Sequence, residues 1–257
     1  FYLGAIAFLG AVVWTVFTTK EYPPEDINEF EQKKKEQAGF LSGTKEILLA
    51  FTKMPSTMIR LAIVQFFSWF ALFAMWIYTT PAVTHHIFNA TDSASKEYNQ
   101  GANWVGVLFS AYNGFAAVCA FLLPVIAAKT SRKTVHAISL IVGGLGLASF
   151  YVIKDPNLLL LSELGIGLAW ASILSMPYAI LAGSLPKDKT GVYMGIFNFF
   201  IVIPQIIAAA ILGAIVKNVF ANEAIYALLL GGFSFFIAAL MVYFVNDVDE
   251  VNVAKSK

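Results

Sequence analysis

Charged residues, cysteine and catalytic motifs are scarce in this chain of 257 residues. Charged side chains make up 13% of the residues, whereas soluble domains carry about 25%. The single cysteine, Cys119, cannot form an internal disulfide, and we interpret it as a small buried hydrophobe. The lysines and arginines form no block large enough to indicate a nucleic-acid partner. With 58% hydrophobic residues, these absences indicate a membrane protein.

The residue patterns of a membrane-embedded enzyme are also absent from the sequence. It contains no Gly-x-Ser-x-Gly nucleophile turn, no phosphate-binding Gly-rich loop with lysine, and no His-Glu-x-x-His metal motif. The adjacent His85 and His86 have no third ligand at a useful spacing, so we expect no metal site. We therefore expect a protein that is not an enzyme and that carries no cofactor.

Apolar runs divide the chain into seven predicted transmembrane helices, which makes the expected fold class an all-α, polytopic membrane protein. The first run, residues 1–17, is interpreted as the end of a spanning helix. Residues 18–57 are polar and charged, and their acids offset their lysines, so we interpret them as a solvated loop rather than a lipid-binding basic patch. Six further spans are predicted at 58–80, 105–128, 135–153, 158–183, 192–216 and 224–245.

The lysines and arginines are distributed unequally between the two sets of helix ends. Fourteen of the seventeen fall on the ends that include the 18–57 loop and the C-terminus, and only Lys96, Lys154 and Lys217 fall on the other set. Because cytoplasmic loops carry the excess of basic residues, the loop and the C-terminus are predicted to be cytoplasmic. The expected location is a plasma membrane or a bacterial inner membrane.

The span at 192–216 has an unusual polar stripe. On a helix, one face carries small and polar residues: Gly191, Gly195, Asn198, Val202, Gln205 and Ala209. Another face carries bulky residues: Phe197, Phe200, Pro204, Ile207 and Ile211. A helix that served only as an anchor would not need two amides in hydrocarbon, so we expect the polar stripe to face a solute or another part of the protein.

Three other spans add candidate binding residues. Glu163 is the one ionisable side chain well inside a span, and it shares a face with Gly167 and Trp170. Such a carboxylate is a functional candidate, although a shallow carboxylate paired with a neighbour is an alternative. Gln65 and Trp69 lie on one face with Leu72 and Trp76, where indole rings suit the C–H face of a sugar and amides suit its hydroxyls. Asn113, like Asn198, could instead hydrogen-bond between helices.

Residues 194–205 resemble the Gly-x-x-Asn-x-x-Ile-x-Ile-Pro-Gln signature of the eleventh helix of sucrose transporters. Residues 175–180, Ser-Met-Pro-Tyr-Ala-Ile, resemble the Ser-x-Pro-[Phe/Tyr]-Ala element of their tenth helix. Trp69-Phe70 and Trp76 are similar to an element of the seventh helix, although the acid often found between those tryptophans is absent. These transporters are glycoside–pentoside–hexuronide cation symporters within the major facilitator superfamily.

The resemblance implies a domain assignment. Residues 1–17 would end the sixth helix of a twelve-helix transporter, and 18–57 would be the central cytoplasmic loop. Residues 58–245 would be the C-terminal six-helix bundle, and 246–257 a cytoplasmic tail. The N-terminal half would then lie outside this chain and would be a partner of it.

The resemblance also implies a function: proton-coupled symport of a disaccharide or related glycoside by alternating access in a lipid bilayer. The sugar would contact the candidate residues Asn198, Gln205, Asn113, Gln65, Trp69 and Trp170, and Glu163 would take part in ion coupling. One alternative is a membrane scaffold or sensor on the same fold that transports nothing. Another is a symporter that uses sodium or carries a different small solute.

Overall fold

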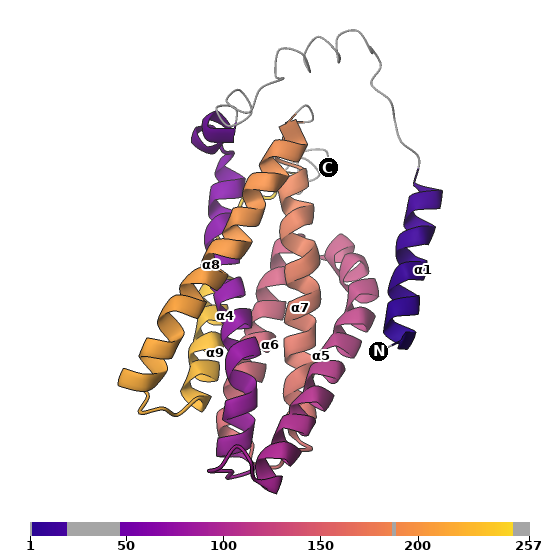
Figure 1. Cartoon of the computed structure of the whole chain (residues 1–257). Helices are drawn as coiled ribbons and strands as arrows, with labels where there is room; N and C mark the ends of the chain where they lie inside the picture. Colours follow the sequence, from indigo (N-terminus) through magenta and orange to yellow (C-terminus); the bar gives the residue numbers. More distant parts are fainter. Residues whose placement is uncertain (1, 20–46, 187–188, 249–257) are drawn as a thin grey trace. The chain divides into compact units, whose positions relative to one another are not determined.

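The computed structural model describes residues 2–19, 47–186 and 189–248 (Figure 1). The chain divides into two compact units, residues 1–49 and 50–257. The first unit contains α1 (Tyr2–Thr18), an apolar helix whose side chains are exposed. Most of the predicted central loop and the end of the predicted tail lie outside the described residues.

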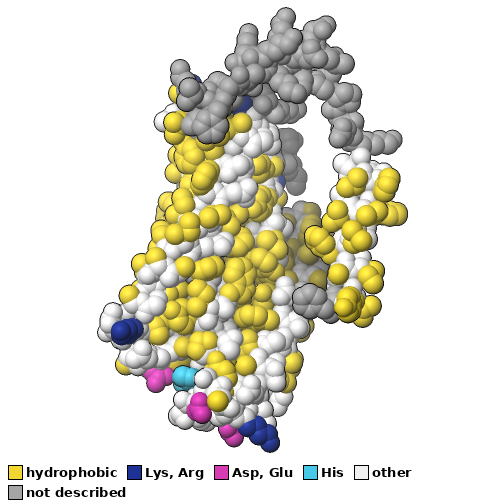
Figure 2. Space-filling view, viewed as in Figure 1, with side chains coloured by type: hydrophobic (Ala, Val, Ile, Leu, Met, Phe, Trp, Pro, Cys, Tyr) yellow, Lys and Arg dark blue, Asp and Glu magenta, His cyan; other side chains and the backbone are white. Residues whose placement is uncertain are grey.

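The second unit is a bundle of six helices, and the described part of the chain contains no strand. The helices are α4 (Ser56–His86), α5 (Lys96–Lys129), α6 (Arg132–Val152), α7 (Leu159–Ala182), α8 (Thr190–Asn218) and α9 (Ile225–Val242). All six are long and apolar enough to cross a membrane, whereas α1 is shorter. Figure 2 shows hydrophobic side chains over the middle of the bundle and charged side chains gathered at its lower end. The predicted all-α, polytopic fold class is confirmed.

Two helices extend well beyond their predicted apolar spans. The sequence predicts a span that ends at Thr80, but α4 continues through Pro81 to His86. The span predicted from Val105 belongs to a helix that begins at Lys96, where the Ser95 side chain accepts a hydrogen bond from the Tyr98 amide at 3.1 Å. An apolar run marks the part of a helix that lies in hydrocarbon, whereas caps determine where the helix ends.

The helices differ in how much of their surface is buried within the unit. The most apolar windows of α4, α6, α7 and α9 are 50–61% buried, but those of α5 and α8 are only 17% and 22% buried. Helix α5 packs mainly on α7, and α8 packs mainly on α4. The bundle therefore has a four-helix interior with α5 and α8 as outer helices.

Glycines allow several helices of the bundle to approach backbone to backbone. A Cβ atom on Gly144 of α6 would lie 2.9 Å from the carbonyl oxygen of Gly232 in α9. On Gly146 it would lie 2.6 Å from the backbone carbonyl oxygen of Ser162 in α7, and on Gly167 it would lie 2.6 Å from the backbone carbonyl oxygen of Tyr112 in α5. In hydrocarbon, where water does not drive helices together, such small-residue contacts are a main source of helix association.

Residues 243–247, which we name the C-terminal strap, connect the end of α9 to α4 and α6. Arg132 at the start of α6 holds Asp247 in a two-bond ion pair at 2.7 and 2.8 Å and donates to the Ala179 oxygen of α7 at 2.8 Å. Arg60 of α4 donates to the Phe244 oxygen at 2.6 Å and to the Asn246 side chain at 3.0 Å. The first residues of the predicted tail, 246 and 247, are therefore held against the bundle.

Candidate functional site

Three tryptophans from two helices meet in the second unit. Trp69 and Trp76 are seven residues apart on α4, so they project from the same face. Trp170 of α7 lies edge-on to both, with ring centroids 5.9 Å from Trp69 and 5.7 Å from Trp76. Because these are favourable distances and orientations for aromatic pairs, we name Trp69, Trp76 and Trp170 the tryptophan cluster.

Tyr112 connects a third helix, α5, to the tryptophan cluster. The Trp76 Nε1–H group donates a hydrogen bond to the Tyr112 hydroxyl at 3.1 Å, and Tyr112 is buried. The sequence pattern indicates the neighbouring Asn113 but not Tyr112, because a tyrosine within an apolar run produces no polar stripe. Trp76 lies half-buried in this cluster.

Buried polar atoms that lack a hydrogen-bond partner in the described residues flank the tryptophan cluster along its helices. Gln65 precedes Trp69 by one turn of α4, and neither its Nε2 nor its Oε1 atom is bonded; Trp69 Nε1 is likewise unbonded. Glu163 precedes Trp170 by two turns of α7, is 1% exposed, and has an unbonded Oε2 atom. An unpaired buried polar group costs about 1–3 kcal/mol, so such groups are candidate ligand contacts.

The Glu163 side of α7 packs against α5. A Cβ atom added to Gly167, one turn from Glu163, would lie 2.6 Å from the backbone carbonyl oxygen of Tyr112, so the two backbones are in direct contact there. Glu163 lies four residues from the first residue of α7, or about 6 Å along the axis. The carboxyl group is therefore near one membrane surface but is enclosed by protein.

The two outer helices expose their polar stripes. On α5, Asn113 is exposed, and its amide donates to the Phe109 oxygen of the same helix at 2.8 Å. On α8, Asn198 is exposed and Gln205 is half-buried, while Phe197 and Pro204 on the bulky face are buried. The α8 helix thus packs through its bulky face and leaves its amide face uncovered by this unit.

The candidate residues therefore form two groups. The first group lies at the tryptophan cluster or within two helical turns of it along the same helices: Gln65, Trp69, Trp170 and Glu163. Asn113, Asn198 and Gln205 lie on the outer helices, and no contact between those two helices is among the main packing contacts of the unit.

Two of the three histidines, His86 and His136, make contacts with other residues of the bundle. No group of three potential metal ligands occurs among these residues. His86 contacts the Lys154 ammonium group and lies 3.0 Å from the Tyr151 oxygen, and its ring stacks on the Tyr151 ring. His136 is fully buried, and its Nδ1 atom lies 2.8 Å from the Ser172 hydroxyl.

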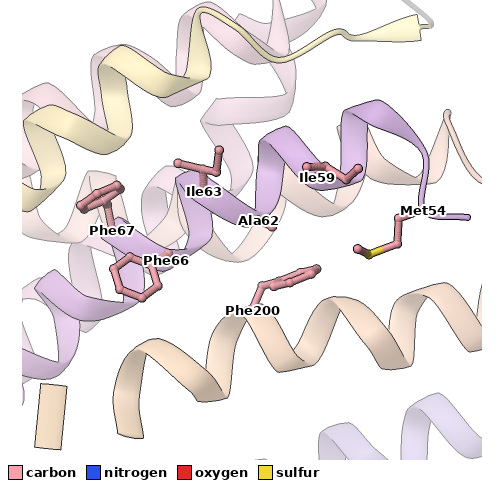
Figure 3. Close-up of a pocket in the computed structure, with 7 residues that line it drawn as sticks. All are labelled: Met54, Ile59, Ala62, Ile63, Phe66, Phe67 and Phe200. Carbon is pink, nitrogen blue, oxygen red and sulfur yellow. The ribbon is translucent and has the colours of Figure 1, made fainter. Parts of the chain in front are cut away.

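A groove of about 440 Å³ lies between α4 and α8 (Figure 3). Its side chains come from the segment just before α4, from the first half of α4 and from one position on α8: Met54, Ile59, Ala62, Ile63, Phe66, Phe67 and Phe200. Every one of them is apolar, so the groove offers no side-chain hydrogen bond to a solute with many hydroxyl groups. It is therefore a poorer candidate for a polar solute than the region of the tryptophan cluster.

Comparison with known proteins places these features in a family. A sucrose transport protein of Oryza sativa subsp. japonica is 27% identical over 243 residues, which cover 81% of this chain and 44% of that protein. A sucrose transport protein of Oryza sativa subsp. indica matches to the same extent. The chain thus spans less than half the length of these relatives. The model of the Major Facilitator Superfamily matches residues 1–209 and 86–257, so the chain belongs to the Major Facilitator Superfamily.

Proposed function

We propose that this chain is part of a secondary active transporter that moves a disaccharide or related glycoside together with a proton. Membership of the Major Facilitator Superfamily and similarity to sucrose transport proteins support sugar transport. The observation that carries the proposal is the tryptophan cluster, flanked by the buried and unpaired polar groups of Gln65 and Glu163. Aromatic faces with a few convergent polar groups are what a sugar requires.

In this proposal the second unit is the C-terminal half of a twelve-helix transporter. Residues 1–17 end the sixth helix, 18–57 form the central cytoplasmic loop, 58–245 form the six-helix bundle, and 246–257 form a cytoplasmic tail. The exposed amides of α5 and α8 support this assignment, because an N-terminal half would give their polar stripes a protein or aqueous neighbour. Transport would occur by rocking of the two halves around the sugar in a cell membrane.

Each candidate residue would contact the sugar or the coupled ion through the chemical group it carries. Trp69 and Trp170 would pack on the apolar face of the sugar ring, and Gln65 would bond its hydroxyls from inside the bundle. Asn113, Asn198 and Gln205 would contact the sugar from the outer helices. Glu163 would be the coupling residue, because a carboxyl group inside a membrane protein is a site where a proton or another cation can bind.

Uptake of labelled sucrose into proteoliposomes, with and without an imposed proton gradient, tests the proposal in the full-length protein. We expect Asn198→Ala and Gln205→Leu to abolish uptake at unchanged protein abundance, while Ile203→Ala on the exposed apolar side of α8 retains it. Normal uptake by both amide variants would refute the sugar-path assignment. Sucrose binding without any uptake would instead indicate a sensor.

The coupling assignment has its own test. We expect Glu163→Gln to retain exchange of labelled for unlabelled sugar but to lose accumulation driven by a proton gradient. Glu97→Gln, which changes an exposed carboxylate in the first turn of α5, is the matched control and should accumulate sugar normally. Proton-driven accumulation by Glu163→Gln at the normal rate would show that another residue couples the proton. Accumulation driven only by a sodium gradient in the unmodified protein would show that the coupled ion is sodium.

A further inference from the structure

A cavity between α6 and α9 changes from polar to apolar along the helix axes. It measures about 280 Å³ and lies where α6 begins and α9 ends. Its polar lining comes from Ser131, Lys133 and Thr134, which are the N-cap and the first turn of α6. Val242 and Tyr243 at the end of α9 complete this outer part, and one turn further along each helix the lining consists of Ala137 and Ala239. We name this cavity the α6–α9 slot.

Helix packing explains why the slot ends within the bundle. Ala137 and Gly144 are seven residues apart on α6, and Ala239 and Gly232 are seven apart on the antiparallel α9, so both pairs lie at one interface two turns apart. At the inner pair the backbones touch, since a Cβ atom on Gly144 would lie 2.9 Å from the Gly232 oxygen. At the outer pair the small alanine side chains leave space. The slot therefore lies toward the helix ends, where these helices meet the membrane surface.

Lys133 places a positive charge at the outer end of the slot. The neighbouring Arg132 is neutralised by its ion pair with Asp247. Lys133 donates to the Tyr243 oxygen at 3.2 Å, and no ion pair joins it to a carboxylate of the described residues. The Ser131 hydroxyl donates to the Thr134 hydroxyl at 2.8 Å, which leaves the Thr134 hydrogen available for another acceptor. An anion at this position would meet an ammonium group and a hydroxyl donor.

We propose that the α6–α9 slot binds the headgroup of an anionic phospholipid from the adjoining leaflet. The phosphate would sit against Lys133 and Thr134, and the first carbons of an acyl chain would pack on Ala137 and Ala239. Basic pockets between transmembrane helices at the membrane surface recognise anionic headgroups in this way. The apolar inner half distinguishes a lipid from free phosphate, which would gain nothing from alanine side chains. The site is independent of the sugar-transport proposal.

Native mass spectrometry of the full-length protein tests this site, after delipidation and addition of equal amounts of phosphatidylglycerol and phosphatidylcholine. We expect preferential retention of phosphatidylglycerol, and a fall of about fivefold in that retention for Lys133→Gln, as for the loss of one lysine at a membrane surface. Lys129→Gln is the matched control, because it removes the same charge at the end of α5, outside the slot lining. Ala137→Leu, which fills the apolar half, should lower retention without changing the charge.

Three results would overturn the proposal. Equal retention of the two lipids by the unmodified protein would show that no anionic headgroup is selected. Equal losses for Lys133→Gln and Lys129→Gln would show only general surface attraction. Displacement of phosphatidylglycerol by inorganic phosphate, with Ala137→Leu binding lipid normally, would assign the slot to a free anion. Gel filtration of each variant verifies folding; if Ala137→Leu does not fold, the two lysine variants decide.

Discussion

Replacement of Asp247 by alanine should destabilise the six-helix unit by about 3 kcal/mol, near the lower end of the range for breaking a buried ion pair. The Asp247 side chain is 1% exposed, and both carboxylate oxygens are bonded to Arg132 at 2.7 and 2.8 Å. Without the carboxylate, the guanidinium group keeps its bond to Ala179 but loses both charge-assisted bonds to Asp247. The Arg132 side chain is 25% exposed, so solvent moderates the cost.

Thermal unfolding in detergent or nanodiscs measures this effect. For a unit of this size, 1 kcal/mol corresponds to about 2–4 °C in Tm, so Asp247→Ala should lower Tm by about 6–12 °C. Asp155→Ala is the matched control, since that residue is an exposed aspartate in a loop between helices and its loss should change Tm by less than about 2 °C.

A double substitution separates the ion pair from the strap as a whole. When both charges are replaced by apolar groups of similar volume, no unpaired charge remains buried, and such replacements are often neutral. Arg132→Met combined with Asp247→Leu should therefore regain a large part of the Tm lost in Asp247→Ala. If the double variant is as unstable as the sum of the two single variants, the loss does not arise from breaking the ion pair, and our reasoning about the strap fails.

Two further predictions concern the contacts between α5 and its neighbours. Gly167→Ala should destabilise the unit by about 1–3 kcal/mol, because its Cβ atom would lie 2.6 Å from the backbone carbonyl oxygen of Tyr112. Gly106→Ala is the control and should be neutral or stabilising, because its Cβ atom would meet no atom within 4 Å. Thermal unfolding of the two variants measures the difference. Tyr112→Phe should cost about 1 kcal/mol by removing the acceptor for Trp76, and an unchanged Tm would contradict the assigned bond.

Local patterns predicted most of the fold because a bilayer imposes a simple rule on each segment. Apolar length identified all six spans of the second unit, since a spanning segment must be both apolar and helical. The same rule could not locate the end of α4 at His86, because beyond the hydrocarbon the chain continues as a helix for reasons of capping and packing. Helix existence was therefore predictable, and helix length was not.

The candidate site was predictable only in part, because partners across helices leave no periodic trace in the sequence. The stripe of Gln65, Trp69 and Trp76 on α4 is visible at helical spacing, and these residues do share a face. That Trp170 would lie against those tryptophans, and that Tyr112 would bond to Trp76, depends on the rotation of α5 and α7 about their axes. The same holds for Asp247, a polar residue after the last span that pairs with Arg132 across 115 positions.

Asn113 and Asn198 differ in how strongly they indicate that their helix faces a further polar neighbour. Asn113 donates to the Phe109 oxygen within its own helix, so its amide loses little in hydrocarbon. Asn198 lies on the exposed face of α8, beside glycines whose Cβ positions meet no atom within 4 Å, and the hydrogen bonds assigned to α8 within the described residues do not include its side chain. An unbonded amide facing lipid would be costly. The α8 stripe is therefore the stronger argument that this unit meets a polar neighbour, and Asn198→Ala should impair uptake more than Asn113→Ala.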